Sequence, residues 1–65
     1  MKNLDNDMFY VIADVFDFLG QKCVKFYNRH IYTGKNVVKA YDKLSEEDKN
    51  SYGIYVLNGL KKVEE

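Results

Sequence analysis

The feature that most constrains the fold is one apolar stripe through the first half of the chain. Its members recur every three or four residues: Met8, Ile12, Val15, Leu19, Cys23, Phe26 and His30. That spacing is the period of an α-helix. Asp5 or Asp7 can cap the start of such a helix, because a side-chain oxygen there accepts a hydrogen bond from a free backbone N–H. The stripe therefore predicts a long first helix over residues 6–31.

Gly20 interrupts this stripe and leaves two other interpretations open. A glycine inside a helix costs about 1 kcal/mol, which a long helix can tolerate. Gly20 can instead act as a C-terminal cap and end the helix early. The other interpretation is that the segments CVKFY and HIYT, which are rich in β-branched and aromatic residues, form strands.

The second half of the chain begins with a break at Thr33-Gly34. The segment that follows, NVVKAYDKL, places its apolar residues on one face and its charged residues largely on the other, which predicts a helix over residues 34–44. Ser45 comes next and is followed by three acidic residues. Serine is a favoured N-cap, and negative charge suits the first turn of a helix. A third helix is therefore predicted to begin at Ser45.

The C-terminal segment has two conflicting signals. Asn58-Gly59 between two apolar runs is typical of a β-hairpin, whereas Tyr52, Val56, Leu60 and Val63 follow a helical spacing. A hairpin would leave the helix after Ser45 very short, and short helices are costly to nucleate. We therefore predict one all-α domain over residues 1–65, with helices at 6–31, 34–44 and 45–61. The alternative is a winged-helix-like α+β fold with a C-terminal hairpin.

The chain has 65 residues, with one cysteine and one histidine. A domain of this size has a marginal core and often relies on a disulfide, a metal or a partner chain. One cysteine forms no internal disulfide, and a closed zinc site needs four ligands. We therefore predict no metal and no cofactor. The lone cysteine, the polar start MKNLDND and the lack of a long apolar run predict a cytoplasmic protein that does not enter a membrane.

No catalytic pattern is evident in the sequence. Ser45 and Ser51 have no recognisable acid–histidine relay, and Asp14 with Asp17 is explained by the solvated edge of an amphipathic helix. We therefore expect no enzymatic activity and no small-molecule substrate.

Nearly every residue between Met8 and Leu19 is apolar. A helix that is apolar all round is buried on more than one side, and two further short helices cover only one broad face. Phe9 and Phe16 are seven residues apart and share a side of the predicted helix. The partner interface is therefore predicted at Phe9, Phe16, Met8 and Ile12, of which the last two also belong to the adjacent stripe that packs on the core.

The predicted function is a non-enzymatic protein–protein interaction module. It self-associates or binds a partner protein, as a small regulator or inhibitor. The composition, rich in Lys, Asn and Tyr, is typical of phage and mobile-element accessory factors.

The alternative function uses a basic stretch in the middle of a chain whose net charge is zero. Residues 22–43 carry six basic side chains against one acidic one and include several aromatic residues. Basic side chains follow phosphates and aromatic rings stack on bases. The alternative is therefore a small DNA- or RNA-binding regulator, with contacts at Lys22, Lys25, Arg29, Tyr32, Lys35, Lys39 and Lys43.

Overall fold

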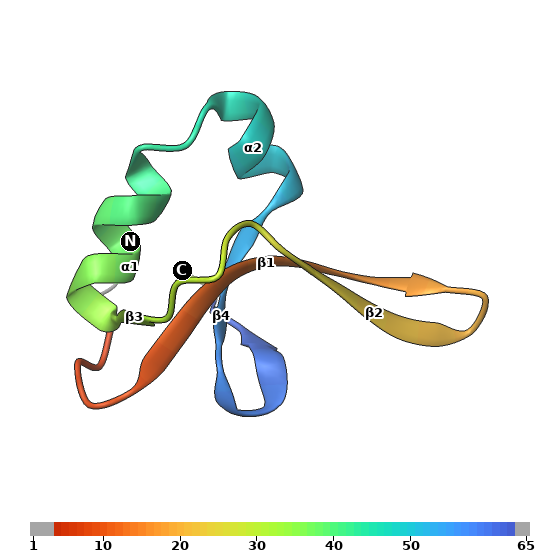
Figure 1. Ribbon diagram of the computed structural model, residues 1–65, viewed down its shortest axis with the longest axis horizontal. Helices are drawn as coiled ribbons and strands as arrows, with labels where there is room; N and C mark the ends of the chain where they lie inside the picture. The colour runs from red at the N-terminus through yellow and green to blue at the C-terminus, as the bar shows by residue number, and fades with distance from the viewer. Residues whose placement is uncertain (1–3, 64–65) are drawn as a thin grey trace.

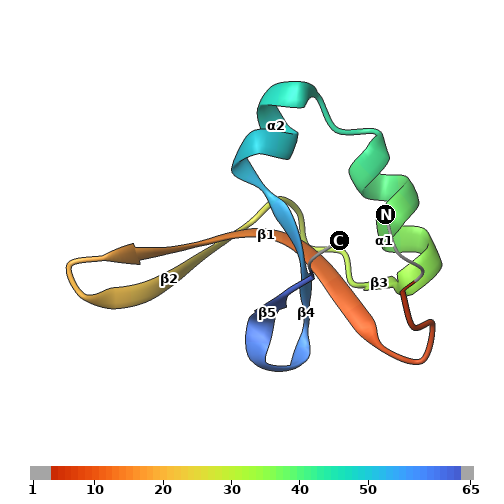
Figure 2. The same ribbon diagram turned by 180° about the vertical axis from the view of Figure 1, so that it is seen from behind.

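The computed structural model describes residues 4–63 and consists of one curled antiparallel sheet with two helices beside it (Figures 1 and 2). The strands run in the order β2-β1-β4-β5, and β3 pairs with the start of β1. The elements in chain order are β1 (Phe9–Phe18), β2 (Gln21–Phe26), β3 (Tyr32–Thr33), α1 (Gly34–Asp42), α2 (Glu46–Ser51), β4 (Gly53–Val56), the 3₁₀ turn η1 (Asn58–Leu60) and β5 (Lys61–Lys62).

The predicted first helix is wrong, because residues 9–26 form the hairpin β1–β2. Leu19 and Gly20 connect its strands, with φ angles of 52° and 80°. Two consecutive positive φ angles define the type I′ turn, whose twist matches that of the flanking strands. Gly20 is thus neither a helix interior residue nor a helix cap. The interpretation of CVKFY as strand agrees with β2, and Tyr32–Thr33 of HIYT forms β3.

Both faces of β1 are buried at its centre, which explains why its sequence lacks an apolar–polar alternation. On one face, Tyr10 and Ile12 pack with Val37 of α1 and Ile54 of β4. On the other face, Val11 and Ala13 pack with Tyr55. A strand buried on both sides reads as a continuous apolar run. Such a run also satisfies a helical spacing, and this produced the incorrect helix.

The two helices of the second half begin where the sequence predicts. α1 starts at Gly34, where an added Cβ would lie 2.8 Å from the carbonyl oxygen of Leu4, so only glycine fits this close approach. The Ser45 hydroxyl accepts a hydrogen bond from the Asp48 N–H at 3.1 Å, which confirms Ser45 as the N-cap of α2. α2 then ends at Ser51.

The third helix does not continue to residue 61, and the chain forms the hairpin β4–β5 instead. Gly59 has a φ of 79° in its loop, a conformation that glycine adopts without strain. β4 pairs with the centre of β1, and Ile54 and Tyr55 enter the two opposite cores. Burial against β1 therefore outweighs the helical spacing.

The all-α prediction and its helical bundle are consequently wrong, since β1 organises a sheet to which the helices are peripheral (Figure 1). The winged-helix-like alternative contained the C-terminal hairpin, which the structure has as β4–β5, but not the hairpin β1–β2.

Candidate interaction surface

The outer halves of β1 and β2 project from the rest of the molecule as a two-stranded ribbon, at the right of Figure 1 and the left of Figure 2. Their register runs from Asp14 opposite Lys25 to Phe18 opposite Gln21. β4 accompanies β1 only as far as Ala13, which pairs with Gly53. Residues 14–25, here called the arm, therefore have two open backbone edges within the part of the chain that the structure describes.

The arm carries large apolar side chains that are exposed. The exposed fraction is 42% for Phe16, 60% for Phe18 and 87% for Leu19. Phe16 and Phe18 are two residues apart on β1, so they lie on the same face. A two-stranded hairpin with no further support is marginally stable in water. The combination of a weakly supported ribbon and exposed aromatic rings is typical of a surface that binds another protein.

The hydrogen bonds of β1 show which backbone groups point to which edge. The Ile12 carbonyl accepts a hydrogen bond from the Tyr27 N–H at 2.9 Å on the β2 side. The Phe9 carbonyl accepts one from the Leu57 N–H at 2.9 Å on the β4 side. Successive residues of a strand alternate between its two edges. The backbone N–H and C=O groups of the even-numbered residues of β1 therefore point toward β2, and those of the odd-numbered residues point toward β4.

Because of this alternation, the N–H and C=O groups of Val15 and Asp17 point away from β2. They face the outer edge that β1 forms in the arm beyond the end of β4, here called the β1 edge. No strand within residues 4–63 pairs with them there. On β2, the same alternation directs the backbone groups of Lys22 and Val24 to the outer edge, away from β1. Each edge of the arm is thus open to a further strand.

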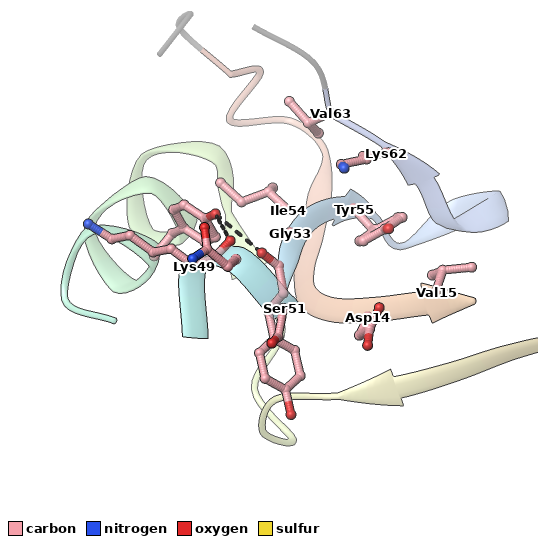
Figure 3. A pocket seen from close by; sticks show the side chains of 12 residues that line it. Asp14, Val15, Lys49, Ser51, Gly53, Ile54, Tyr55, Lys62 and Val63 are labelled. Atoms are coloured by element: carbon pink, nitrogen blue, oxygen red, sulfur yellow. Dashed lines mark hydrogen bonds between the residues drawn. The ribbon is translucent and has the colours of Figure 1, made fainter. Parts of the chain in front are cut away.

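A pocket of about 380 Å³ lies where the β1 edge becomes open (Figure 3). Asp14 and Val15 line it from β1, Gly53 and Tyr55 from β4, and Lys62 from β5. The end of α2 and Tyr52 complete its wall. The Tyr41 hydroxyl donates to the backbone carbonyls of Lys49 (3.0 Å) and Tyr52 (3.2 Å), which connects α1 to the end of α2 at this wall.

The arm also segregates its charges by strand. Asp14 and Asp17 are on β1, whereas Lys22 and Lys25 are on β2, and each aspartate lies opposite a lysine in the register. Opposite charges that face each other across a sheet contribute roughly 0.2–1 kcal/mol. One edge strand of the arm is therefore acidic and the other basic.

The structure separates the residues that were predicted to form the partner interface. Ile12 is 1% exposed and lies in the core, so it has no contact surface to offer. Met8 and Phe9 are exposed at the start of β1, beside a hollow of about 260 Å³ that Leu57 also lines. Phe16 is on the arm. An odd separation in a strand puts Phe9 and Phe16 on opposite faces, whereas the predicted helix placed them on one side.

The predicted nucleic-acid contacts are likewise divided between separate elements. Lys22 and Lys25 lie on opposite faces of β2, and Arg29 follows that strand. The Tyr32 hydroxyl accepts a hydrogen bond from the Asn28 amide at 2.9 Å, and its ring packs against the core. The remaining three lysines, Lys35, Lys39 and Lys43, are exposed along α1 and its C-cap, on the other side of the molecule from the arm tip (Figure 1).

Sequence reasoning missed Phe18 and Leu19 as candidate interaction residues. The available signal was Leu19-Gly20 between two segments rich in β-branched and aromatic residues, VFDF and KCVKF.

No protein-family model, curated protein or solved structure is significantly similar to this chain. Within residues 4–63, the helices are too short or too polar to cross a membrane. The same residues contain no group of three or more His, Cys, Asp or Glu side chains placed to hold a metal ion.

Proposed function

We propose that the protein is a non-enzymatic protein–protein interaction module and that the arm is its binding element. The observation that carries this proposal is the combination of an open backbone edge with exposed aromatic residues on the same ribbon. Burying one aromatic side chain contributes roughly 1.5–3 kcal/mol. Covering Phe16 and Phe18 would therefore provide a large share of the stability of a domain this small, whose total is of the order of 5 kcal/mol.

The binding mode that the arm supports is the addition of a strand. An extended segment pairing with Val15 and Asp17 finds two N–H donors and two C=O acceptors along the β1 edge. Backbone hydrogen bonds of this kind provide affinity, and pockets beside the edge select side chains. The pocket bounded by Asp14, Gly53 and Lys62 is placed to make that selection.

The arrangement of polar side chains supports a binding role over catalysis. Ser51 lines the pocket beside the arm, whereas His30 lines a separate apolar hollow with Val11 and Phe26. Nucleophilic catalysis by serine needs a base within hydrogen-bond reach. The one histidine of the chain, His30, does not line the pocket that contains Ser51, so it is not placed to act as that base.

A second candidate function is nucleic-acid binding, and the lysine row of α1 is the observation that favours it. Lys35, Lys39 and Lys43 are exposed and spaced four apart, so they share one side of the helix. Three lysines in a row can follow a phosphate backbone, and such binding weakens steeply with salt.

Photo-crosslinking in the cell that makes the protein tests these two functions. A photoreactive amino acid is placed at Phe18 on the arm, and a matched variant carries it at Lys39 on α1. We expect covalent adducts to a defined protein segment from position 18, mapped by mass spectrometry, and few from position 39. Nucleic-acid adducts from position 39, with no protein adduct from position 18, would contradict the proposed function and support the second candidate.

A further inference from the structure

The outer edge of β2, here called the β2 edge, is open along the whole strand. The Tyr27 N–H donates to the Ile12 carbonyl, so the odd-numbered residues of β2 bond to β1. The backbone groups of Lys22, Val24 and Phe26 therefore point outward, and no strand that the structure describes pairs with them. The β1 edge, in contrast, is closed at its inner end by β4. The inference below rests on the proposed function, since it names a partner for the second edge of the same arm.

The exposed apolar side chains of the arm gather on one of its faces. Phe16 and Phe18 are two residues apart on β1 and so share a face. Cys23 lies directly opposite Phe16 in the register and belongs to the same face. All three side chains are at least partly exposed. A strand added to the β2 edge comes to lie beside Cys23, so its side chains decide whether this apolar face continues.

The β2 strand of a second copy fits this edge about a two-fold axis at Cys23. Antiparallel pairing about that residue places Lys22 opposite Val24 of the other copy. The backbone groups of both residues point outward, so these pairs exchange ladder hydrogen bonds. Lys25 meets Gln21 of the other copy, and Cys23 meets its own counterpart. Each lysine therefore meets a neutral side chain and keeps the aspartate that faces it within its own arm.

The other antiparallel registers of two β2 edges are less favourable. Pairing about Lys22 or about Lys25 opposes two lysines directly, and like charges opposite each other in a sheet are destabilising. Pairing about Val24 carries the turn of one arm level with Asn28 of the other copy, where the chain has already left β2. Pairing about Cys23 keeps the turn of each arm within the length of the other β2 strand.

We propose that the protein forms a closed two-fold dimer, in which the β2 edges of two copies pair antiparallel about Cys23. The two arms then form one four-stranded sheet, with the two β2 strands at its centre. Phe16 and Cys23 of one copy are followed across this sheet by Cys23 and Phe16 of the other, so the apolar face is continuous between the copies. Three or more strands with an apolar face are stable where a two-stranded ribbon is marginal. The β1 edge of each copy stays open for strand addition.

Oxidation of the cysteine tests this register. Cys23 bonds to β1, so between the copies it forms a non-hydrogen-bonded pair with a Cα separation of about 4.5 Å. A disulfide spans that distance. The matched control is a Cys23→Ser, Lys39→Cys variant, whose thiol lies on α1 outside the arm. We expect diamide to link the wild-type chain into a disulfide dimer at least about tenfold faster than the control, because the dimer holds the two thiols together.

A pair of new cysteine positions distinguishes this register from its neighbours. In the Cys23→Ser background, Gln21→Cys and Lys25→Cys carry thiols that the register sets opposite each other between copies. Each variant alone should crosslink slowly, while a 1:1 mixture should give a mixed disulfide dimer. Pairing about Val24 would instead set the thiol of Lys25→Cys opposite Cys23 of a wild-type chain.

Proline variants test the edge itself with the thiol reduced. Val24→Pro removes an N–H that faces the β2 edge, and Val15→Pro removes one that faces the β1 edge. Neither N–H bonds inside the arm, and proline is tolerated at edge positions of a sheet. In analytical ultracentrifugation we expect Val24→Pro to be monomeric, while Val15→Pro and the wild type form a dimer and nothing larger. Circular dichroism of each variant verifies that it is folded.

Any of four results would overturn the inference. A wild-type chain that stays monomeric at millimolar concentration would exclude the dimer. Association that Val15→Pro removes and Val24→Pro keeps would place the contact on the β1 edge. A mixed crosslink of Lys25→Cys with wild type that exceeds the one with Gln21→Cys would exclude the register about Cys23. Photo-crosslinks from position 18 to a different protein, found with a monomeric chain, would overturn the dimer and leave the proposed function standing.

Discussion

Replacing Leu19 with asparagine is expected to stabilise the isolated protein. Leu19 occupies the first position of the Leu19-Gly20 turn with a φ of 52°. An L-residue other than Asn, Asp or Gly in this left-handed region costs about 1–2 kcal/mol. Asparagine adopts the region readily and is the preferred residue before glycine in a type I′ turn. Leu19 is 87% exposed, so little burial is lost on its removal.

The net gain in the free energy of unfolding is therefore about 1 kcal/mol, which for a domain of this size raises Tm by roughly 4–8 °C. The measurement is urea and thermal unfolding followed by circular dichroism, at a concentration where ultracentrifugation shows a monomer. Leu19→Ala is the matched control, because it removes the apolar side chain but keeps a residue that is strained at positive φ. It should show no gain.

A Leu19→Asn variant that melts at or below wild type would refute this reasoning, since it would mean that the turn is unstrained or that the leucine contributes packing. Confirmation would also have a functional meaning. Strained residues often persist where the strain serves a function. If Leu19 contacts a partner as part of the proposed binding element, Leu19→Asn should weaken association while it stabilises the monomer.

Four further predictions concern the rest of the fold. Gly59→Ala should lower the free energy of unfolding by roughly 1 kcal/mol in a urea titration, because φ at Gly59 is 79°. An added Cβ meets no atom within 4 Å, so the loss is a backbone effect alone. The predicted helix required a gain in stability instead, and a measured gain would contradict the hairpin. Ser45→Ala should cost about 1 kcal/mol by loss of the cap to Asp48, with Ser45→Asp retaining stability as the control. Ile12→Ala should lower the free energy of unfolding by about 2–5 kcal/mol and unfold much of the protein at 37 °C, since Ile12 is 1% exposed in the core. A folded variant of near-normal Tm would contradict that placement. Phe16→Ser and Phe18→Ser should each change the free energy of unfolding of the monomer by less than about 1 kcal/mol, because both side chains are exposed. A global loss of circular dichroism signal in either variant would show instead that the arm packs on the domain.

The sequence by itself determined those features that depend on neighbouring residues. The start of α2 follows from Ser45 and the acids after it, because the cap is a contact between residues three apart. Thr33-Gly34 likewise marked the start of α1, although Thr33 makes no side-chain cap hydrogen bond and Gly34 is required by its close approach to the distant Leu4. The excess of apolar residues between Met8 and Leu19 also led to the prediction that a first helix would leave Phe9 and Phe16 uncovered, although that helix is wrong. Phe9 and Phe16 are indeed exposed, while their role in an interface stays a prediction.

Tertiary structure alone decided that residues 9–26 are a hairpin and which of their residues share a face. The period of two that marks a strand is visible only when one face is polar. In β1, α1 covers the face of Tyr10 and Ile12, and the curled sheet covers that of Val11 and Ala13, so the alternation is lost at its centre. The burial that stabilises β1 comes from Val37, Ile54 and Tyr55, which lie more than twenty residues further along the chain. Because those contacts are non-local, neither the spacing within β1 nor its propensities could reveal that its outer end would project with open edges.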